Sequence, residues 1–310
     1  IGKYENNGRD EAEKIKYFIK YAIEEWNISY VLLVGGHKNQ KHSWYVPVRY
    51  SNLHDRSFWN DSYITDLYYA DIYDSQGNYS SWDTDFDGIY GEWPDFQEME
   101  DKIDLSPDVH LGRLACMFGF EVITMVNKII DYELNAYGSI WFKNLIVCGG
   151  DTFHKKLEDG TNYDEGEVAN NKALEYMKEF NHIKLWASLE NLTTANIQKE
   201  ISNGAGFLYF VGHGNPEQWA THENCNKNWT EGIRNRDIYK LTNKGMYPIL
   251  MVGGCHNSEF DVTPLNLLKN PRESWYFTTW VTECWSWVFV KKNRGGAIAS
   301  IGSTGYGGVN

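Results

Sequence analysis

Five short, continuously apolar segments, each ending at or beside a glycine, constrain the fold of this 310-residue chain more than any other feature. They occupy residues 30–36, 145–150, 207–212, 249–254 and 297–302. Short apolar runs rich in β-branched residues are typical of strands buried on both faces of a parallel sheet. Segments with apolar residues at helical spacing alternate with them, at residues 10–26, 121–137, 166–180, 193–203, 235–243 and 284–292. The alternation predicts an α/β fold with a mostly parallel sheet flanked by helices.

The order helix, strand, Gly-Gly occurs twice, around positions 36 and 150. This repeat predicts two sheet-containing subdomains, an N-terminal α/β subdomain at residues 1–140 and a catalytic one at residues 141–310. The segment at about residues 50–105 does not show the helix–strand pattern of either subdomain, because it is aromatic, acidic and rich in turn residues. We interpret it as a long functional insertion in the first subdomain.

The charge of the chain argues against nucleic acid as a partner, and its hydropathy argues against a membrane-spanning segment. The formal net charge is −13, from 29 Lys and Arg against 42 Asp and Glu, and such a surface repels a phosphate backbone. No run of about 18 apolar residues is present, so no membrane-spanning segment is expected. The sequence begins at Ile1 and ends in a Gly-rich stretch, so we expect a pro-domain or C-terminal domains outside it. Five cysteines leave at least one thiol outside any disulfide framework.

Reactive side chains follow the predicted strands directly. In an open parallel sheet, ligands bind outside the carboxyl ends of the strands. The residues to consider there are Asp151, His213, Cys255 and the loop from Ser303. A cysteine is nucleophilic as its thiolate, which a neighbouring histidine can stabilise before passing the proton to a leaving amine. The backbone N–H groups of Gly214 and Cys255 could stabilise the resulting oxyanion.

Two other interpretations of the Cys–His pair remain open. Each residue alone is more often a buried, inert structural group than a catalytic one. Zinc is a second alternative, because His222-x-x-Cys225 has ligand spacing and three further ligand types are available in this region. Those three are His213, Cys255 and His256. The sequence contains no second closely spaced pair to complete such a site.

The chain resembles the gingipain family of cysteine peptidases, within the clan of caspases, legumain and clostripain. The resemblance rests on residues 65–71, 82–92 and 107–114 together with Gly-His213-Gly and Gly-Gly-Cys255 at the two strand ends. It implies a caspase-like three-layer sandwich, with Cys255 as nucleophile and His213 as base. It further implies that Asp151 is the acid that orients this histidine, although an Asp at a strand end can also serve as a turn or N-cap residue.

The same resemblance suggests where substrate specificity resides. In the arginine-specific members an acidic residue at the base of the primary pocket lies in the segment that here reads Asn-Tyr-Asp-Glu-Gly-Glu, residues 162–167. The candidates are Asp164, Glu165 and Glu167, which would select Arg or Lys through charge-assisted hydrogen bonds. Alternatively, acidic residues before a helix can simply stabilise its N-terminus through the helix dipole, without a role in substrate binding. Tyr306 is a candidate for the pocket wall, and Trp285 and Trp287 are alternatives that also fit a packed helix.

An acidic loop in the insertion predicts a calcium site. Oxygen ligands recur at every second position, as in the first half of an EF-hand loop, although Pro94 stands where that motif requires Glu. The predicted ligands are Asp83, Asp85, Asp87, the backbone carbonyl of Ile89, and Glu92. A solvated acidic loop without an ion is the alternative.

These features favour a secreted or cell-surface, calcium-stabilised cysteine endopeptidase that cleaves proteins or peptides after Arg or Lys. Two alternatives are a sortase-like transpeptidase that resolves the thioester with an amine, and a non-catalytic calcium-binding surface module.

Overall fold

The computed structural model describes residues 8–54, 62–94, 100–153, 160, 163–223 and 226–306. The chain divides into two compact units, residues 1–118 and 119–310, which we call the first and the second unit. The division precedes helix α3 (Gly119–Asn135), so this helix belongs to the second unit, whereas the sequence predicted a boundary near residue 140.

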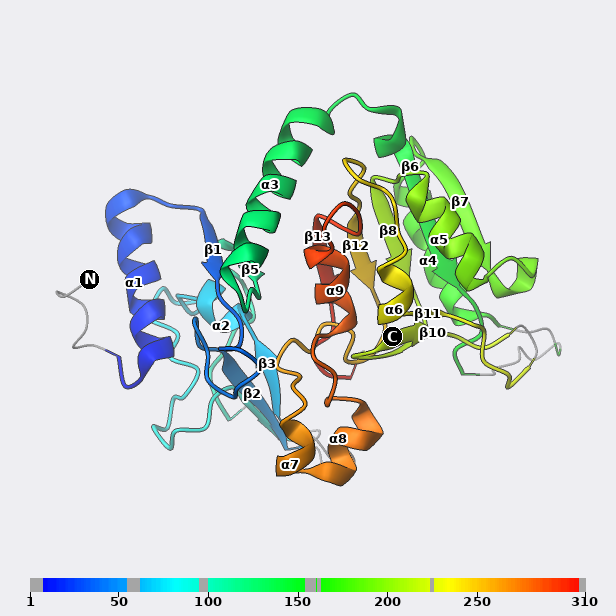
Figure 1. Cartoon of the computed structure of the whole chain (residues 1–310). Coiled ribbons are helices and arrows are strands. Elements are labelled where there is room, and N and C mark those ends of the chain that lie inside the picture. Colours follow the sequence, from blue (N-terminus) through cyan, green and yellow to red (C-terminus); the bar gives the residue numbers. More distant parts are fainter. Residues whose placement is uncertain are drawn as a thin grey trace. The chain divides into compact units, whose positions relative to one another are not determined.

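A five-stranded parallel sheet forms the centre of the second unit (Figure 1). Its strand order is β13-β12-β8-β6-β7, and every neighbouring pair is parallel. The strands are β6 (Asn144–Gly149), β7 (Asn181–Trp186), β8 (Phe207–Phe210), β12 (Ile249–Val252) and β13 (Ala299–Gly302). Four of these five strands are the apolar segments that the sequence identified in this half. The mostly parallel sheet is therefore confirmed.

Helices cover both faces of this sheet. Successive strand residues point to opposite sides, so apolar side chains lie on each face and pack against helices there. Ile146, Leu208 and Leu250 face one way and pack in one core with residues of α5, α6 and α9. Leu145 and Val147 face the other way and pack with Leu174 of α4. The covering helices are α4 (Glu165–Tyr176), α5 (Thr194–Ser202), α6 (Asn235–Ile238) and α9 (Trp285–Lys291). The result is the three-layer arrangement expected for the fold.

A small antiparallel sheet lies on the α5, α6 and α9 side. Its order is β11-β10-β9, with β9 at His213–Asn215, β10 at Gln218–Ala220 and β11 at Ile233–Arg234. Trp219 and Ile233 are fully buried in the core shared with those helices. This second sheet therefore begins at His213, just beyond the end of β8.

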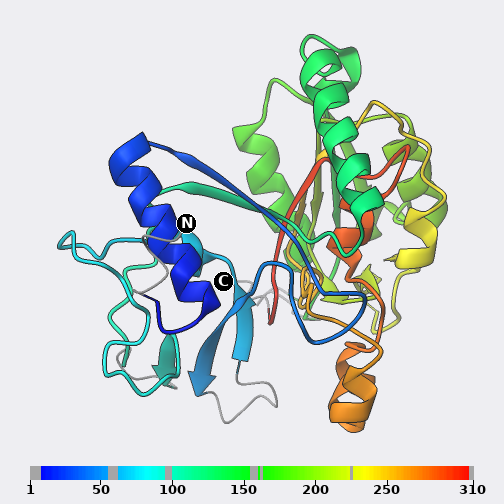
Figure 2. The same ribbon diagram turned by 60° about the vertical axis from the view of Figure 1, so that its left-hand side comes forward.

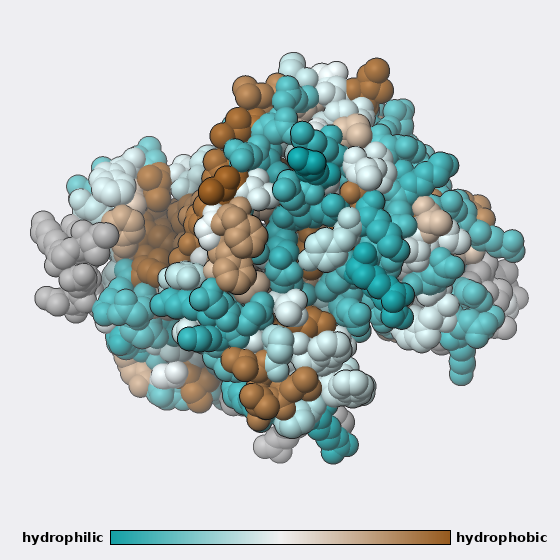
Figure 3. Space-filling model, in the orientation of Figure 1, coloured by the Kyte–Doolittle hydropathy of each residue, from teal (hydrophilic) through white to brown (hydrophobic). Residues whose placement is uncertain are grey.

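Helix α3 is joined to the rest of the second unit by a buried lysine. The Lys128 Nζ lies 2.6–3.3 Å from four backbone carbonyl oxygens near the end of α9 and before β13. These belong to Val290, Lys292, Gly295 and Ala297. The outward side of α3 is apolar, with exposed Phe120, Ile123, Ile130 and Leu134, and brown residues lie over this helix in Figure 3.

The first unit contains two small sheets. Helix α1 (Glu11–Trp26), N-capped by Asp10, lies beside the parallel pair β1 (Tyr30–Val34) and β5 (His110–Leu114) (Figure 2). The second sheet has the order β3-β2-β4, with β2 at Arg49–His54, β3 at Ser62–Thr65 and β4 at Glu92–Pro94. Helix α2 (Leu67–Ala70) and the loop after it supply Tyr68, Tyr69 and Trp82 to the core around α1. Much of the segment interpreted as an insertion is thus integral to this core.

Short elements complete the chain, and they are η1 (Ile140–Lys143), η2 (Ala187–Leu189), α7 (Asn266–Lys269) and α8 (Pro271–Phe277). No helix in the described ranges is both long and apolar enough to cross a bilayer.

Candidate active site

Three neighbouring strands of the parallel sheet end in register. Cys148 of β6 pairs with Phe210 of β8, and Phe210 pairs with Val252 of β12. Three residues beyond this row come the sequence-predicted site residues, in the spatial order Asp151, His213 and Cys255. The strand register therefore delivers all three to one edge of the sheet, with His213 on the middle strand.

The loops that carry His213 and Cys255 touch through their glycines. A Cβ on Gly254 would lie 3.1 Å from the Cα of Gly214, and a Cβ on Gly214 would lie 2.8 Å from the carbonyl oxygen of Cys255. The 2.8 Å contact leaves no room for a Cβ on Gly214, and the 3.1 Å contact is tighter than nearly all real Cβ contacts. The two glycines thus allow the histidine and cysteine backbones to approach one another, as a Cys–His pair requires.

Asn257 joins the same two loops by hydrogen bonds. Its side chain is fully buried, and its Nδ2 donates to the carbonyl oxygens of Asn215 at 2.8 Å and Gln218 at 2.9 Å. These carbonyls flank the β9–β10 turn, so the residue two positions after the cysteine holds the strand that begins with His213. Sequence reasoning missed this residue, because an Asn in a loop has no distinctive signal.

Cys255 is the partly exposed thiol among the four described cysteines. Cys116, Cys148 and Cys284 are buried. Burial raises the pKa of the Cys148 thiol well above its usual value and that of Cys284 to about 12. Those two thiols therefore stay protonated and inert at neutral pH, and Cys255 is the accessible candidate for a thiolate.

The His213 ring is oriented by a backbone carbonyl. Its Nε2 lies 2.9 Å from the carbonyl oxygen of Thr152, and its face is bordered by Trp229, with ring centroids 5.1 Å apart. A ring that donates its Nε2–H to a carbonyl keeps Nδ1 as the basic nitrogen. The partner that sequence reasoning missed is therefore the residue after Asp151, acting through its main chain.

Asp151 is buried directly beside this arrangement. Its own carbonyl oxygen accepts hydrogen bonds from the Thr221 hydroxyl at 2.8 Å and the His222 amide at 3.0 Å. These bonds tie the end of β6 to the segment that directly follows β10. Asp151 thereby fixes the segment that presents the Thr152 carbonyl to His213.

The three candidate acids of the specificity pocket have different surroundings. Glu165 accepts the backbone amides of Thr152 and Phe153, and Glu167 accepts the amide and hydroxyl of Ser188. Asp164 Oδ1 is buried and has no hydrogen-bond partner in the described part of the chain. Burial, together with the nearby carboxylates, raises the pKa of Asp164 to about 6. Glu165 Oε1 also lacks a partner in the described part of the chain, so Asp164 and Glu165 each have an oxygen available for a ligand, and Glu165 is in addition held by two backbone amides.

The aromatic candidates for the pocket wall also differ in burial and in position. Trp285 is fully buried, with its Nε1–H bonded to the Ile233 carbonyl, and Trp287 is buried on the same helix. Tyr306 is 38% exposed and packs edge-on against His256. Burial and the neighbouring Tyr276 and Cys255 raise the pKa of the Tyr306 hydroxyl to about 12. Tyr306 thus lies near the nucleophile candidate, whereas the two tryptophans are core residues.

The acidic loop brings three carboxylates together. Asp83, Asp85 and Asp87 can each place one oxygen within 4.8 Å of the others. A Ca²⁺ ion bound at 2.3–2.6 Å per oxygen, as is typical, fits such a triangle. Asp83 is fully buried, and its Oδ1 has no partner among the described residues, whereas its Oδ2 pairs with Arg9 at 2.5 Å. The donor set therefore suits a hard divalent cation.

The other predicted ligands of that loop are less closely tied to it. Ile89 is partly exposed, and its amide donates to Asp87. Glu92 is buried in β4, with its amide bonded to Asp101. Among the described residues, no group of His and Cys side chains has metal-ligand geometry, so the zinc alternative gains no support there. Cys225 lies outside the described residues.

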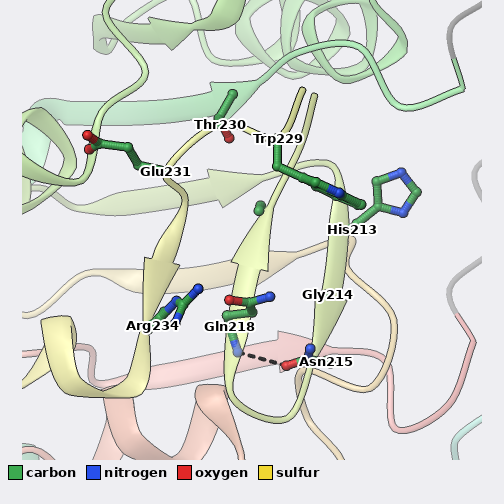
Figure 4. A pocket seen from close by; sticks show the side chains of 9 residues that line it. His213, Gly214, Asn215, Gln218, Trp229, Thr230, Glu231 and Arg234 are labelled. Carbon is green, nitrogen blue, oxygen red and sulfur yellow. Dashed lines mark hydrogen bonds between the residues drawn. The ribbon is translucent and has the colours of Figure 1, made fainter. Parts of the chain in front are cut away.

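A pocket of about 340 Å³ opens beside His213 and was not expected from the sequence (Figure 4). His213, Gln218, Trp229, Glu231 and Arg234 contribute to its lining. Most of these residues belong to strands of only two or three residues, which leave no periodic signal in the sequence.

Comparisons with known proteins bear on the family and the fold of the chain. The family model described as Peptidase family C25 matches residues 1–310. Among solved structures, the chain is similar to the Arg-specific cysteine proteinase gingipain R, with a TM-score of 0.58 and 18% identity over 95% of this chain and 53% of that one.

A second similar structure is the complex of the pro- and mature domains of RgpB from Porphyromonas gingivalis, with a TM-score of 0.59, 18% identity, and 95% and 54% of the two chains covered. A third, described as a protease, has a TM-score of 0.55 and 14% identity over 98% and 53%. The chain thus spans about half the length of these relatives. No curated protein sequence is significantly similar to it.

Proposed function

The chain belongs to peptidase family C25, and from this premise we propose that it is a cysteine endopeptidase with Cys255 as nucleophile and His213 as general base. The observation that carries the proposal is the common position of these two residues, three places beyond paired residues of adjacent strands, with their loops in backbone contact at Gly214 and Gly254.

The reaction follows from these positions. His213 Nδ1 takes the thiol proton, and the Cys255 sulfur attacks the peptide carbonyl carbon, while the N–H groups of Gly214 and Cys255 hold the oxyanion. The protonated imidazole gives its proton to the leaving amine as the C–N bond breaks. A water molecule, deprotonated by the same imidazole, then cleaves the thioester and restores the thiol. The Thr152 carbonyl keeps the ring oriented throughout.

The enzyme cleaves after Arg or Lys. The support is the buried Oδ1 of Asp164, which lacks a partner in the described chain. Glu165 Oε1 lacks one as well, but two backbone amides hold the other oxygen of Glu165, and Glu167 is occupied by Ser188. A guanidinium or ammonium group would complete the hydrogen bonding of the Asp164 carboxylate. Burial makes such a charge-assisted pair stronger than an exposed one.

Calcium, secretion and a pro-domain belong to the same proposal. Asp83, Asp85 and Asp87 would hold a structural Ca²⁺ ion, and this ion would neutralise their negative charge. Millimolar extracellular calcium suits such a site and agrees with a secreted or cell-surface protein. The similarity to a protein whose pro- and mature domains form a complex supports a pro-domain outside this chain.

The decisive experiment uses fluorogenic peptides that differ only at the residue before the cut. We expect reduced, fully processed enzyme to hydrolyse the Arg and Lys peptides, and an acyloxymethyl ketone to label Cys255 and none of the other cysteines by mass spectrometry. Cys255→Ala should abolish both. Absence of hydrolysis together with absence of labelling contradicts the activity, whereas hydrolysis only after Asp or Asn contradicts the specificity alone.

A further inference from the structure

The pocket beside His213 is formed by one face of the short antiparallel sheet. Trp219 and Ile233 point into the core, so their neighbours Gln218 and Arg234 point the opposite way, into the pocket. Ala220 pairs with His213 at one end of this face. Gln218 pairs with both Asn215 and Arg234 and forms the next row, two residues along the strand. That row lies about 7 Å from the histidine's row.

The pocket lies where the C-terminal part of the substrate, which leaves first as the free amine, would be bound. A general acid that protonates the leaving amine stands next to the residues that follow the scissile bond. His213 is in the wall of this pocket. The Asp164 carboxylate lies at the start of α4, which packs on the opposite face of the parallel sheet. A peptide that crosses the sheet edge from Asp164 therefore enters the pocket with its C-terminal portion.

The chemistry of the far end of the pocket suits an anion. Arg234 contributes a guanidinium that makes no ion pair within the described residues, and Gln218 adds an amide beside it. The one acidic residue of the lining, Glu231, accepts the backbone amide of Thr194 at 2.9 Å. In Figure 4 its carboxylate points away from His213. Trp229 supplies an apolar wall beside the histidine.

We propose that this pocket is a subsite for the leaving peptide and that Arg234, with Gln218, binds a carboxylate on the second residue after the cut. The proposal rests on the proposed peptidase function and extends it to the other side of the scissile bond. An extended peptide advances about 3.3 Å per residue, so its second residue reaches the row of Gln218 and Arg234. The carboxylate has two possible sources, an acidic side chain or the C-terminus of a substrate that ends there.

The experiment uses internally quenched peptides with the preferred residue before the cut and Glu, Gln or Lys as the second residue after it. A parallel pair ends at that residue with a free acid or an amide. We expect the Glu peptides to show a kcat/KM about tenfold above the Gln peptides, as one charge-assisted hydrogen bond predicts. Arg234→Gln should remove this preference. Arg236→Gln, on the exposed side of the following helix and outside the lining, should keep it.

Two further measurements separate the possible outcomes. Peptidyl aminocoumarins have no residues after the cut, so both arginine variants should hydrolyse them like the wild type. If the side-chain pair discriminates and the acid–amide pair does not, the source is an acidic side chain, and the reverse identifies the C-terminus. Equal rates within both pairs of peptides, or a preference that survives Arg234→Gln, overturn the proposal.

A binding arm tests the subsite even if no peptide is hydrolysed. Fluorescein-labelled peptides that begin with a free amine and carry Glu or Gln at their second position are titrated into Cys255→Ala protein and followed by fluorescence anisotropy. Tighter binding of the Glu peptide, lost in the additional Arg234→Gln variant, supports the pocket independently of the activity. Equal affinity of the two peptides, together with equal affinity of a free-acid and an amide peptide that end at this position, contradicts it.

Discussion

At the scale of single residues, hydrogen-bond partners decide which of several similar side chains is available for a ligand. Glu165 and Glu167 lie within three residues of Asp164, yet each is bound to groups of its own structure. Removing either would leave backbone amides without an acceptor. Such a change would alter stability first and specificity only indirectly.

The raised pKa of Asp164 predicts a pH-dependent specificity. Below its pKa of about 6 the carboxyl is neutral and binds a guanidinium weakly, and above it the carboxylate forms an ion pair. We therefore compare kcat/KM for an Arg peptide with kcat/KM for a citrulline peptide, and expect the ratio of the two to rise with pH through about 6. Titration of the catalytic groups affects both peptides equally and does not change this ratio. Asp164→Asn should make the ratio low and flat. A flat ratio in the wild type contradicts this role for Asp164.

Asn257 predicts a large effect from a nearly isosteric change. Asn257→Asp replaces a buried donor by a carboxylate facing the carbonyls of Asn215 and Gln218. We expect a loss of about 3 kcal/mol in the free energy of unfolding, measured by urea denaturation. The exposed Asn171→Asp is the matched control and should change stability by less than about 0.5 kcal/mol. A similarly small effect at Asn257 would show that the clamp contributes little.

At the scale of elements, one side chain fixes α3 to the end of α9. The Lys128 ammonium is surrounded by four carbonyl oxygens and lies 4.7 Å from the centroid of the Tyr247 ring. Several of these carbonyls would otherwise be buried acceptors without a donor. A tethered cation thus satisfies the C-terminal end of a helix that has no glycine cap.

Lys128→Met tests this arrangement. Methionine fills similar space but donates no hydrogen bond, so we expect a loss of about 3 kcal/mol or more in unfolding free energy. Lys172→Met, at an exposed position of α4, should be nearly neutral. If added ammonium or potassium ions stabilise the small-residue variant Lys128→Ala and leave the wild type unchanged, the four carbonyls form a true cation cage. Equal stabilities of Lys128→Met and the wild type contradict the role.

The sequence predicted elements well where a strand is an uninterrupted apolar run. Strands β6, β8, β12 and β13 are continuous apolar runs, and the end of each could be located to within a few residues. Strand β7 was missed because Asn181, His182 and Lys184 interrupt its apolar residues, whereas β13, also an edge strand, is a continuous apolar run. The strands of the small sheet are too short to show a period. The three strand-end site residues could thus be predicted, but the pocket beside them could not.

Side-chain partners were beyond prediction for a different reason. The different surroundings of the three acids depend on which amides of residues 152, 153 and 188 lie nearby, and this is set by the packing of distant segments. The orientation of His213 by the Thr152 carbonyl depends on a main-chain atom, which every residue has. Sequence patterns distinguish side chains and not backbone positions.

At the scale of the whole molecule, the two units carry different predicted sites. The acidic loop lies in the first unit, and Cys255 and His213 lie in the second. A ligand that binds only a folded unit stabilises that unit by mass action. Calcium should therefore act on the first unit alone.

Calorimetry tests this expectation. We expect two unfolding transitions, with millimolar Ca²⁺ raising the midpoint of one and chelation lowering it again. An excess of Ca²⁺ of about 100 times its dissociation constant corresponds to about 2.7 kcal/mol. The double variant Asp85→Asn, Asp87→Asn should abolish the shift. The variant Asp74→Asn, at an exposed turn outside the carboxylate triangle, should retain it. Midpoints that are indifferent to calcium contradict the site.

The register of β6, β8 and β12 has a consequence for how such a chain can vary in length. The strand ends carry all the positional information for Asp151, His213 and Cys255, because each is counted from the same paired row. The exposed connections that contain no site residue and no partner of one carry none. Natural or engineered insertions in those connections should leave the chemistry intact, whereas one extra residue between a strand and its active-site side chain would turn that side chain to the other face. Length variation among related chains should therefore accumulate between the strands and stop three residues short of each reactive group.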